Sequence, residues 1–341
     1  MTTPTPDSAP QGPTPERIFQ TLSAYQQTAA LKAAIELKVF TSVAEGADTA
    51  DALAARCETS ERGMRILCDY MTVHGFLRKQ DGRYSLTEES ALFLDRRSPA
   101  YVGGVAEFVA GTHIVEGYRE LTEAVRKGGT MLPAQGSMTP EHPMWEDFAR
   151  GMTAMARPSA EAIPQIVGAA GMETCKVLDI AAGHGIYGIT VARENPRAQV
   201  YAVDWQKVLE IARGNAEAQG VAERFHEIPG DAFEVDFGEG YDLALLTNFF
   251  HHFDPPTCER LMRKVHAALG DGGRAVTVEF VPDESRVTPP MHAAFALVML
   301  GTTPAGDAYT FSEFEQMFRN AGFSRSESHP TPVQHIIVSH K

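Results

Sequence analysis

The sequence has little of what marks disulfide-stabilised, zinc-binding or nucleic-acid-binding proteins. Its 341 residues include only four cysteines, and no two of them stand in a CxxC pair or at another short metal-ligand spacing. Lys and Arg number 30 against 44 Asp and Glu, which gives a net charge of −14, and such a chain repels a phosphate backbone. We therefore expect a cytoplasmic protein in a reducing compartment, without a metal site and without a nucleic-acid partner.

Long hydrophobic runs are also missing. The most apolar stretch, at 291–300, has half of the roughly 20 residues that a membrane-spanning helix needs, so we expect no membrane partner. Residues 1–14 are rich in Thr and Pro and lack the basic segment and apolar core of a signal peptide. We expect a flexible tail there. The whole chain has 43% hydrophobic residues, a globular composition, and its length of 341 residues predicts two domains or one domain with a large extension.

Residues 15–98 show helical periodicity and then a hairpin. The patterns predict one helix from Pro15, a second after Thr49 and a third after Thr59 or Ser60. Segment 76–86 contains two short strand-like runs around an Asp-Gly turn. Helices followed by such a hairpin predict a winged-helix domain.

The charge of this winged helix bears on its role. Between residues 48 and 83 there are six basic and six acidic side chains, whereas a module that reads a DNA groove carries a basic excess. The third helix is also more apolar than a solvent-facing recognition helix. We therefore favour burial against a partner subunit over DNA binding.

Residues 99–170 form a predicted helical connector. Trp145, Phe148, Met152 and Met155 fall at i, i+3, i+7 and i+10, so they share one helical face. Such a face is ordinarily core, and the alternative is that it walls an apolar substrate pocket.

From residue 171 to 341 strand-like and helical segments alternate. Strand-like runs occupy 176–180, 199–203, 241–246 and 274–278, and helical stretches at 208–219 and 257–269 lie between them. This alternation predicts parallel strands with right-handed crossovers. Two further strands after residue 323 predict an antiparallel edge pair. The expected fold class is α/β, a Rossmann-like doubly wound sheet of seven strands with the last pair antiparallel, preceded by the mostly helical winged-helix domain.

A glycine motif follows the first of these strands. Gly183-x-Gly185-x-x-Gly188 matches the dinucleotide fingerprint, and Asp204 ends the next strand, where a ribose-binding acid is expected. Alone, this pattern predicts NAD. Asp179, however, stands at the end of the first strand, and a carboxylate four residues before Gly183 suits a ligand with a cationic amino-acid end and no pyrophosphate.

With these residues the sequence resembles the class I S-adenosylmethionine (SAM)-dependent methyltransferases, with Ala181 in place of their first glycine. The resemblance implies that SAM is the cofactor. It places the methionine part at Asp179 and the glycine turn, the ribose at Asp204 and the adenine at 231–233. The implied cofactor-binding residues are Asp179, Ala181, Gly183, Gly185, Asp204, Trp205, Asp231, Ala232, Phe233 and Asn248. Trp205 either lies against the adenine or is a partly buried structural residue.

The resemblance narrows at Asn248-Phe249-Phe250-His251-His252-Phe253-Asp254. This segment is similar to that of small-molecule O-methyltransferases of the caffeate, polyketide and phenazine type, in which a histidine acts as base. Their Val-Glu appears as Val278-Glu279, and their Gly-Lys-Glu-Arg-Thr appears as 306–310 with Ala308 at the second glutamate. That carboxylate is missing unless Asp307 substitutes. The family's N-terminal domain implies a homodimer.

Methyl transfer to a phenol needs alignment and removal of a proton. A phenol has a pKa near 10 and a histidine one of about 6.5, so His251 is the candidate base, with Glu279 holding its other ring nitrogen. The alternative is that His251 only shapes the loop. Adjacent histidines in an extended segment point to opposite faces, which disfavours a metal site at His251 and His252.

The acceptor pocket is expected between the carboxyl edge of the sheet and the helices at 99–170 and 286–304. Its predicted lining is apolar and partly aromatic, which suits a flat small-molecule acceptor: Trp145, Phe148, Met152, Phe295 and Met299. Three alternatives stay open: methyl transfer to carbon or nitrogen, a SAM-sensing winged-helix regulator, and a NAD oxidoreductase.

Overall fold

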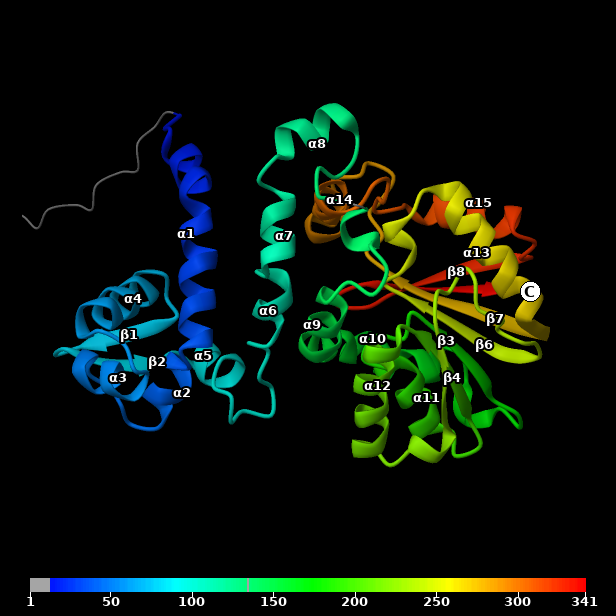
Figure 1. The fold of residues 1–341 in the computed structure, drawn as a ribbon, viewed down its shortest axis with the longest axis horizontal. Coiled ribbons are helices and arrows are strands. Elements are labelled where there is room, and N and C mark those ends of the chain that lie inside the picture. Colours follow the sequence, from blue (N-terminus) through cyan, green and yellow to red (C-terminus); the bar gives the residue numbers. More distant parts are fainter. Residues whose placement is uncertain (1–12, 134) are drawn as a thin grey trace, which may run out of the picture. The chain divides into compact units, whose positions relative to one another are not determined.

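The computed structural model describes residues 13–133 and 135–341, and the chain divides into two compact units between Gly103 and Gly104 (Figure 1). Residues 1–12 of the expected tail lie outside the described residues. The helices expected as a separate connector belong to the same unit as the large sheet. No helix of the described chain is long and apolar enough to cross a membrane.

The first unit has the element order of a winged helix. Its elements are α1 (Glu16–Glu36), α2 (Val39–Ala44), α3 (Ala50–Arg56), α4 (Glu61–Val73), β1 (Leu77–Gln80), β2 (Arg83–Leu86) and α5 (Glu88–Phe93). Ser60 caps α4 by accepting a hydrogen bond from the Gly63 amide. The hairpin turns at Asp81 and Gly82, which both have positive φ, as a two-residue turn between twisted strands requires.

Helix α1 keeps an apolar stripe exposed within the single chain. Ile18, Phe19, Leu22 and Tyr25 are 62–70% exposed, and they follow one another at helical spacing. Contiguous apolar surface of this kind marks an interaction site.

The second unit contains a seven-stranded sheet in the order β5-β4-β3-β6-β7-β9-β8. The strands are β3 (Lys176–Ile180), β4 (Gln199–Asp204), β5 (Phe225–Pro229), β6 (Tyr241–Thr247), β7 (Leu269–Glu279), β8 (Arg325–Pro330) and β9 (His335–His340). Only β9 runs antiparallel to its neighbours β7 and β8. The predicted doubly wound sheet with a final antiparallel pair is therefore confirmed. Order reverses between β3 and β6, and the ligands of such sheets bind at the carboxyl ends there.

Helices cover both faces of this sheet (Figure 1). The helices of the second unit are α6 (Val105–Val109), α7 (Thr112–Gly117), α8 (Leu121–Lys127), α9 (Met144–Gly151), α10 (Thr153–Ile166), α11 (Ile186–Glu194), α12 (Gln206–Ala218), α13 (Pro255–Ala268), α14 (Pro290–Thr302) and α15 (Phe311–Asn320). Of these, α10, α11 and α12 pack on one face of the sheet, and α13 and α15 pack on the other. Val177 packs in the core with α10, α11 and α12, while its neighbour Leu178 packs in the core with α13 and α15. The alternation of β3 side chains thus builds two apolar layers and leaves the strand ends free for polar groups.

Candidate active site

The turn after β3 contains three residues with left-handed backbone conformation. Ala181, Gly183 and Gly185 have φ of +53°, +56° and +71°, a region that glycine adopts freely and other residues do not. The alanine in place of the motif's first glycine therefore carries a backbone strain of about 1 kcal/mol. The Gly185 amide closes the turn on the Ala182 carbonyl at 2.7 Å, and α11 begins directly after it.

Asp179 is fully buried behind this turn. One carboxylate oxygen, Oδ2, accepts the Gly188 amide at 3.1 Å, and a Cβ at Gly188 would come within 2.7 Å of that oxygen. The other oxygen, Oδ1, is buried without a hydrogen-bond partner among the described residues. Burial raises the pKa of Asp179 well above its usual value. An unsatisfied buried acceptor fits a ligand that brings hydrogen-bond donors, as the cationic amino-acid end of SAM does.

Asp204 ends β4 with both oxygens held by the backbone. Oδ2 accepts the Gly183 amide at 2.8 Å, and Oδ1 accepts the Trp205 amide at 2.7 Å. Burial raises the pKa of Asp204 to about 6, against the lowering effect of these two hydrogen bonds. The carboxylate is thus fixed beside the glycine turn, and each oxygen keeps a lone pair for a hydroxyl.

The remaining predicted cofactor residues lie on the neighbouring loops. Trp205 is partly buried at the start of α12. Asp231 accepts the Phe233 amide at 2.8 Å, and Ala232 between them is buried. The ring of Phe233 packs edge-on against Phe253, with centroids 5.0 Å apart.

Asn248, after β6, takes part in a polar chain that the sequence did not reveal. It has φ +55° and donates through Nδ2 to the Tyr187 hydroxyl at 3.2 Å, while its Oδ1 accepts from Gln334 Nε2. Tyr187 lies inside the glycine motif, so its position in the sequence could have indicated that it belongs to the site. Gln334 belongs to the turn between β8 and β9, and no local pattern links that turn to β6.

His251 and Glu279 form a buried pair at the carboxyl ends of β6 and β7. Nδ1 of His251 lies 2.5 Å from Oε2 of Glu279, and the side chains are 6% and 2% exposed. Oε1 of Glu279 also accepts the Phe249 amide at 3.0 Å and the His251 amide at 3.3 Å. A carboxylate can only accept, so Nδ1 donates. The Nε2 lone pair is left free, and Nε2 has no hydrogen-bond partner among the described residues.

The expected orientation of the two adjacent histidines is wrong. Residues Phe250–His252 form a 3₁₀ turn, not an extended segment, and the His251 and His252 rings lie on the same side with centroids 4.2 Å apart. Burial lowers the pKa of His252 well below its usual value. In the described part of the chain no group of three or more His, Cys, Asp or Glu side chains could hold a metal ion.

Aromatic side chains from two helices, α9 and α14, lie near these rings and the glycine turn. Trp145 of α9 meets His252 edge-on at 5.2 Å, and Phe295 of α14 meets His251 edge-on at 4.8 Å. Phe148 lies beside the glycine turn, where a Cβ at Gly183 would come within 3.2 Å of its ring. Three of the predicted lining residues thus lie next to the histidine turn or the glycine turn: Trp145, Phe295 and Phe148. The other two are Met152, partly buried between α9 and α10, and Met299, buried on α14.

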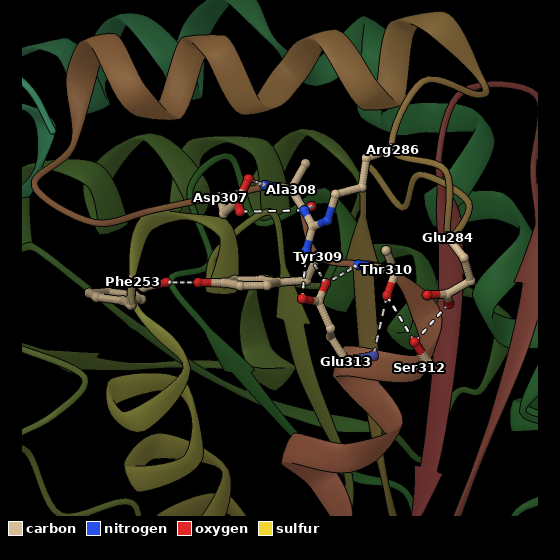
Figure 2. Close-up of polar contacts among 9 residues, drawn as sticks. All are labelled: Phe253, Glu284, Arg286, Asp307, Ala308, Tyr309, Thr310, Ser312 and Glu313. Carbon is tan, nitrogen blue, oxygen red and sulfur yellow. Dashed lines mark hydrogen bonds and ion pairs between the residues drawn. The ribbon is translucent and has the colours of Figure 1, made fainter. Parts of the chain in front are cut away.

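The segment 306–310 does not return a carboxylate to His251. Ala308 is buried and has only a methyl group. Oδ1 of Asp307 accepts the Ala308 amide at 2.8 Å, and Oδ2 lies 3.4 Å from the guanidinium of Arg286. Figure 2 shows the Asp307 carboxylate engaged with Arg286, so the carboxylate of Glu279 supports His251 by itself among the described side chains.

Both units of the chain match families of known proteins. Residues 118–324 match the model of the O-methyltransferase domain, and residues 19–96 match that of the O-methyltransferase dimerisation domain. A putative O-methyltransferase from Nostoc punctiforme is 52% identical, with a TM-score of 0.93 over 97% of this chain and all of that one.

More distant relatives are similar over nearly the whole chain. The 3-hydroxy-5-methyl-1-naphthoate 3-O-methyltransferase of Streptomyces sahachiroi is 29% identical over 304 residues, 87% of this chain and 86% of that protein. Human N-acetylserotonin methyltransferase in complex with SAM is 20% identical, with a TM-score of 0.83 over 98% of this chain and 99% of that one. At that identity the second likeness concerns the fold alone.

Proposed function

Since the chain is a SAM-dependent member of the O-methyltransferase family, we propose that it methylates a hydroxyl group of a small, flat aromatic acceptor, with His251 as the general base. The observation that carries this proposal is the buried His251–Glu279 pair at the carboxyl edge of the sheet. It leaves one basic nitrogen free in an aromatic environment.

The acids at the strand ends would hold the cofactor. Oδ1 of Asp179, which has no hydrogen-bond partner among the described residues, would accept from the amino-acid end. Asp204 would use its free lone pairs for the ribose hydroxyls, and the loop 231–233 would frame the adenine. When bound, SAM would supply a sulfonium methyl group for in-line transfer: the acceptor oxygen would bond to the methyl carbon as the methyl–sulfur bond breaks, with S-adenosylhomocysteine as the leaving group. The left-handed turn at 181–185 lets the backbone approach the cofactor closely.

His251 would take the proton of the acceptor hydroxyl on Nε2. Glu279 keeps the Nδ1 proton in place, so the free lone pair is the one that faces away from the carboxylate. After proton uptake the imidazolium remains paired with Glu279, which stabilises the charge in a buried place. A general base is needed because a phenol with a pKa near 10 is mostly protonated at neutral pH.

An aromatic acceptor is supported by the side chains around the histidines and by the relatives. Trp145 and Phe295 offer apolar ring edges next to His252 and His251. The relatives include a naphthoate 3-O-methyltransferase and a tetracenomycin polyketide 8-O-methyltransferase of Streptomyces glaucescens, the second 26% identical over 312 residues. We therefore assign fused-ring phenols as the first class of acceptor to test.

A homodimer is supported by the first unit. The apolar stripe on α1, made of Ile18, Phe19, Leu22 and Tyr25, lies in the region that matches the dimerisation model. Leu22→Asp should convert a dimer to a monomer in light scattering. A wild-type monomer at micromolar concentration would contradict the proposal.

The direct test of the activity uses SAM with a labelled methyl group and a panel of hydroxynaphthoates, naphthols and catechols. Mass spectrometry and NMR of the product distinguish an ether from a C-methylated ring. We expect an O-methyl product with the wild type, and a rate at least about 100-fold lower for His251→Asn. His329→Asn, on β8, serves as the control histidine and should behave as wild type. Equal rates for the wild type and His251→Asn would show that His251 is not the general base.

A further inference from the structure

The turn that carries His251 has little support of its own. It is a single 3₁₀ turn of three residues, Phe250–His252, and such turns have poorer hydrogen-bond geometry than an α-helix. Its orientation therefore depends on its neighbours. Oε1 of Glu279 accepts the His251 amide, and the Cys258 thiol donates to the Phe250 carbonyl at 3.3 Å and to the Phe253 carbonyl at 3.8 Å. The carbonyls of His251 and Phe253 both meet the segment 306–310.

Two hydrogen bonds join that segment to the turn. The Asp307 amide donates to the His251 carbonyl at 3.0 Å, and the Tyr309 hydroxyl donates to the Phe253 carbonyl at 2.5 Å. Gly306 lies so close that a Cβ there would come within 2.2 Å of the His251 carbonyl oxygen. The segment thus holds the turn by hydrogen bonds to the carbonyls on either side of His252.

The same segment is fixed from its other side by Arg286. Its guanidinium donates to the Ala308 carbonyl at 3.1 Å and to both oxygens of Glu313 at 2.5 and 2.6 Å. Thr310 and Glu313 form a capping box at the start of α15. Figure 2 shows these contacts converging on 307–310, with the Tyr309 ring reaching across to Phe253.

Tyr309 is suited to a fixed, uncharged role. It is 4% exposed and belongs to the core beneath α13 and α15, where its ring meets Phe314 edge-on at 5.8 Å. Burial raises the pKa of its phenol well above the usual value, so it stays a donor throughout the neutral range. Ala308 has no polar side chain to offer, so the support that this segment gives the turn passes through the Asp307 amide and the Tyr309 hydroxyl.

We propose that Tyr309 is a positioning residue for the reaction: its hydrogen bond to the Phe253 carbonyl orients the 3₁₀ turn so that Nε2 of His251 faces the acceptor hydroxyl. This inference rests on the proposed role of His251 as base. It makes Tyr309 important for the rate of proton removal and not for the binding of SAM.

Tyr309→Phe removes one oxygen atom and keeps the ring in the core. Tyr241→Phe is a matched control, because the Tyr241 hydroxyl also donates to a backbone carbonyl, that of Phe237 at 2.6 Å, and its side chain is 2% exposed. Tyr241 begins β6, at the amino end of the strand. Both variants lose one buried hydrogen bond of the same kind, so a general loss of stability should be similar in the two.

We expect Tyr309→Phe to lower kcat for a hydroxynaphthoate about tenfold or more, because a base displaced by a fraction of an ångström reacts poorly. KM for SAM and the Kd for S-adenosylhomocysteine (SAH) should stay within about twofold of the wild type. Tyr241→Phe should keep the wild-type kcat. In ¹⁵N NMR, the His251 ring should show a single Nδ1-protonated tautomer in the wild type and in Tyr241→Phe, and a shifted or mixed state in Tyr309→Phe.

The outcomes separate this inference from the base assignment. A fully active His251→Asn removes the base, whatever Tyr309 does. An inactive His251→Asn with a Tyr309→Phe that matches Tyr241→Phe overturns the positioning role alone. Should none of the panel be methylated, the NMR spectra decide: His251 signals in Tyr309→Phe identical to those of the wild type overturn the proposal.

Discussion

Replacement of Asp204 by Asn should weaken cofactor binding strongly and leave the fold intact. Both oxygens of Asp204 are held by backbone amides, those of Gly183 and Trp205, at 2.8 and 2.7 Å. Asn keeps the size of the side chain but replaces one of these acceptors by a donor. The amide that faces the new NH₂ group then loses its partner, and the ribose loses its charged acceptor.

The magnitude follows from the kind of hydrogen bond lost. A hydrogen bond to a charged group contributes about 1.5–3 kcal/mol. In Asp204→Asn the remaining amide oxygen can still accept one hydrogen bond, without the charge. We expect a loss of about 2–4 kcal/mol in binding free energy, which is a rise in Kd of roughly 30- to 1000-fold. Isothermal titration with SAH measures it without an acceptor.

The same carboxylate predicts a pH dependence with a definite sign. Burial raises the pKa of Asp204 to about 6, and the ribose hydroxyls need the ionised form as acceptor. Affinity for SAH should therefore be constant above about pH 7 and fall as the pH drops through 6, to roughly one tenth at pH 5. Asp179, whose pKa is also raised, acts in the same direction. In Asp204→Asn the component with a midpoint near 6 should be absent.

Asp236→Asn provides the matched control, because Asp236 also accepts a backbone amide in a loop, that of Gly238 at 2.9 Å, on an exposed part of the same unit. Its Kd for SAH should equal that of the wild type. If Asp204→Asn bound SAH as tightly as Asp236→Asn, with the same pH dependence, Asp204 would have no part in the cofactor site.

Three further predictions concern the pair, the strained turn and a buried histidine. Glu279→Gln should lower the methyl-transfer rate about 100-fold or more, because the amide cannot stabilise the imidazolium, while SAH titration shows an unchanged Kd; a normal rate would contradict the pairing. Ala181→Gly should change the free energy of unfolding by no more than about 1 kcal/mol from the wild type, since relief of backbone strain offsets the greater freedom of the unfolded chain. Ala181→Val should lower the free energy of unfolding by about 1–2 kcal/mol in urea unfolding. Equal stabilities of the two variants would argue against the left-handed turn. Burial lowers the pKa of His184 from 6.5 to about 4. Between these pH values the unfolded chain binds more protons than the folded one. The free energy of unfolding should therefore decrease as the pH falls from 6.5 to 4, by up to about 3 kcal/mol. His184→Gln should lack that component, and wild-type and variant curves that run parallel over this range would refute it.

The sheet was predictable because its signals are local. Strands β3, β4 and β6 and residues 274–278 of β7 are short runs of mainly aliphatic residues, whereas β5, with His226 and Glu227, has no such run. The parallel order follows from the alternation with helices. Asp179 and Asp204 could be found for the same reason, since each closes a strand and both ends lie at one edge of a sheet. Glu279 ends β7, and His251 follows the end of β6 at Thr247 by four residues, so the sequence places them at that edge as well.

The contacts that orient these side chains could not be predicted, because they depend on the geometry of loops. The 3₁₀ turn that brings His252 beside His251 has no periodic signature. The contacts of Gln334 with Asn248 and of Tyr309 with Phe253 join residues 86 and 56 positions apart in the chain. The strain at Ala181 was foreseeable as a cost, but the sign of its φ came only from the structure.

The role of His251 as base can be measured most directly with a series of acceptors of one ring system whose hydroxyl pKa falls from about 10 to 6. The rate ratio of wild type to His251→Asn is determined for each acceptor at pH 7.5 with saturating SAM. If His251 removes the proton, the ratio is large for the least acidic acceptor and approaches one as the acceptor ionises by itself. A ratio that stays the same across the whole series would contradict the account.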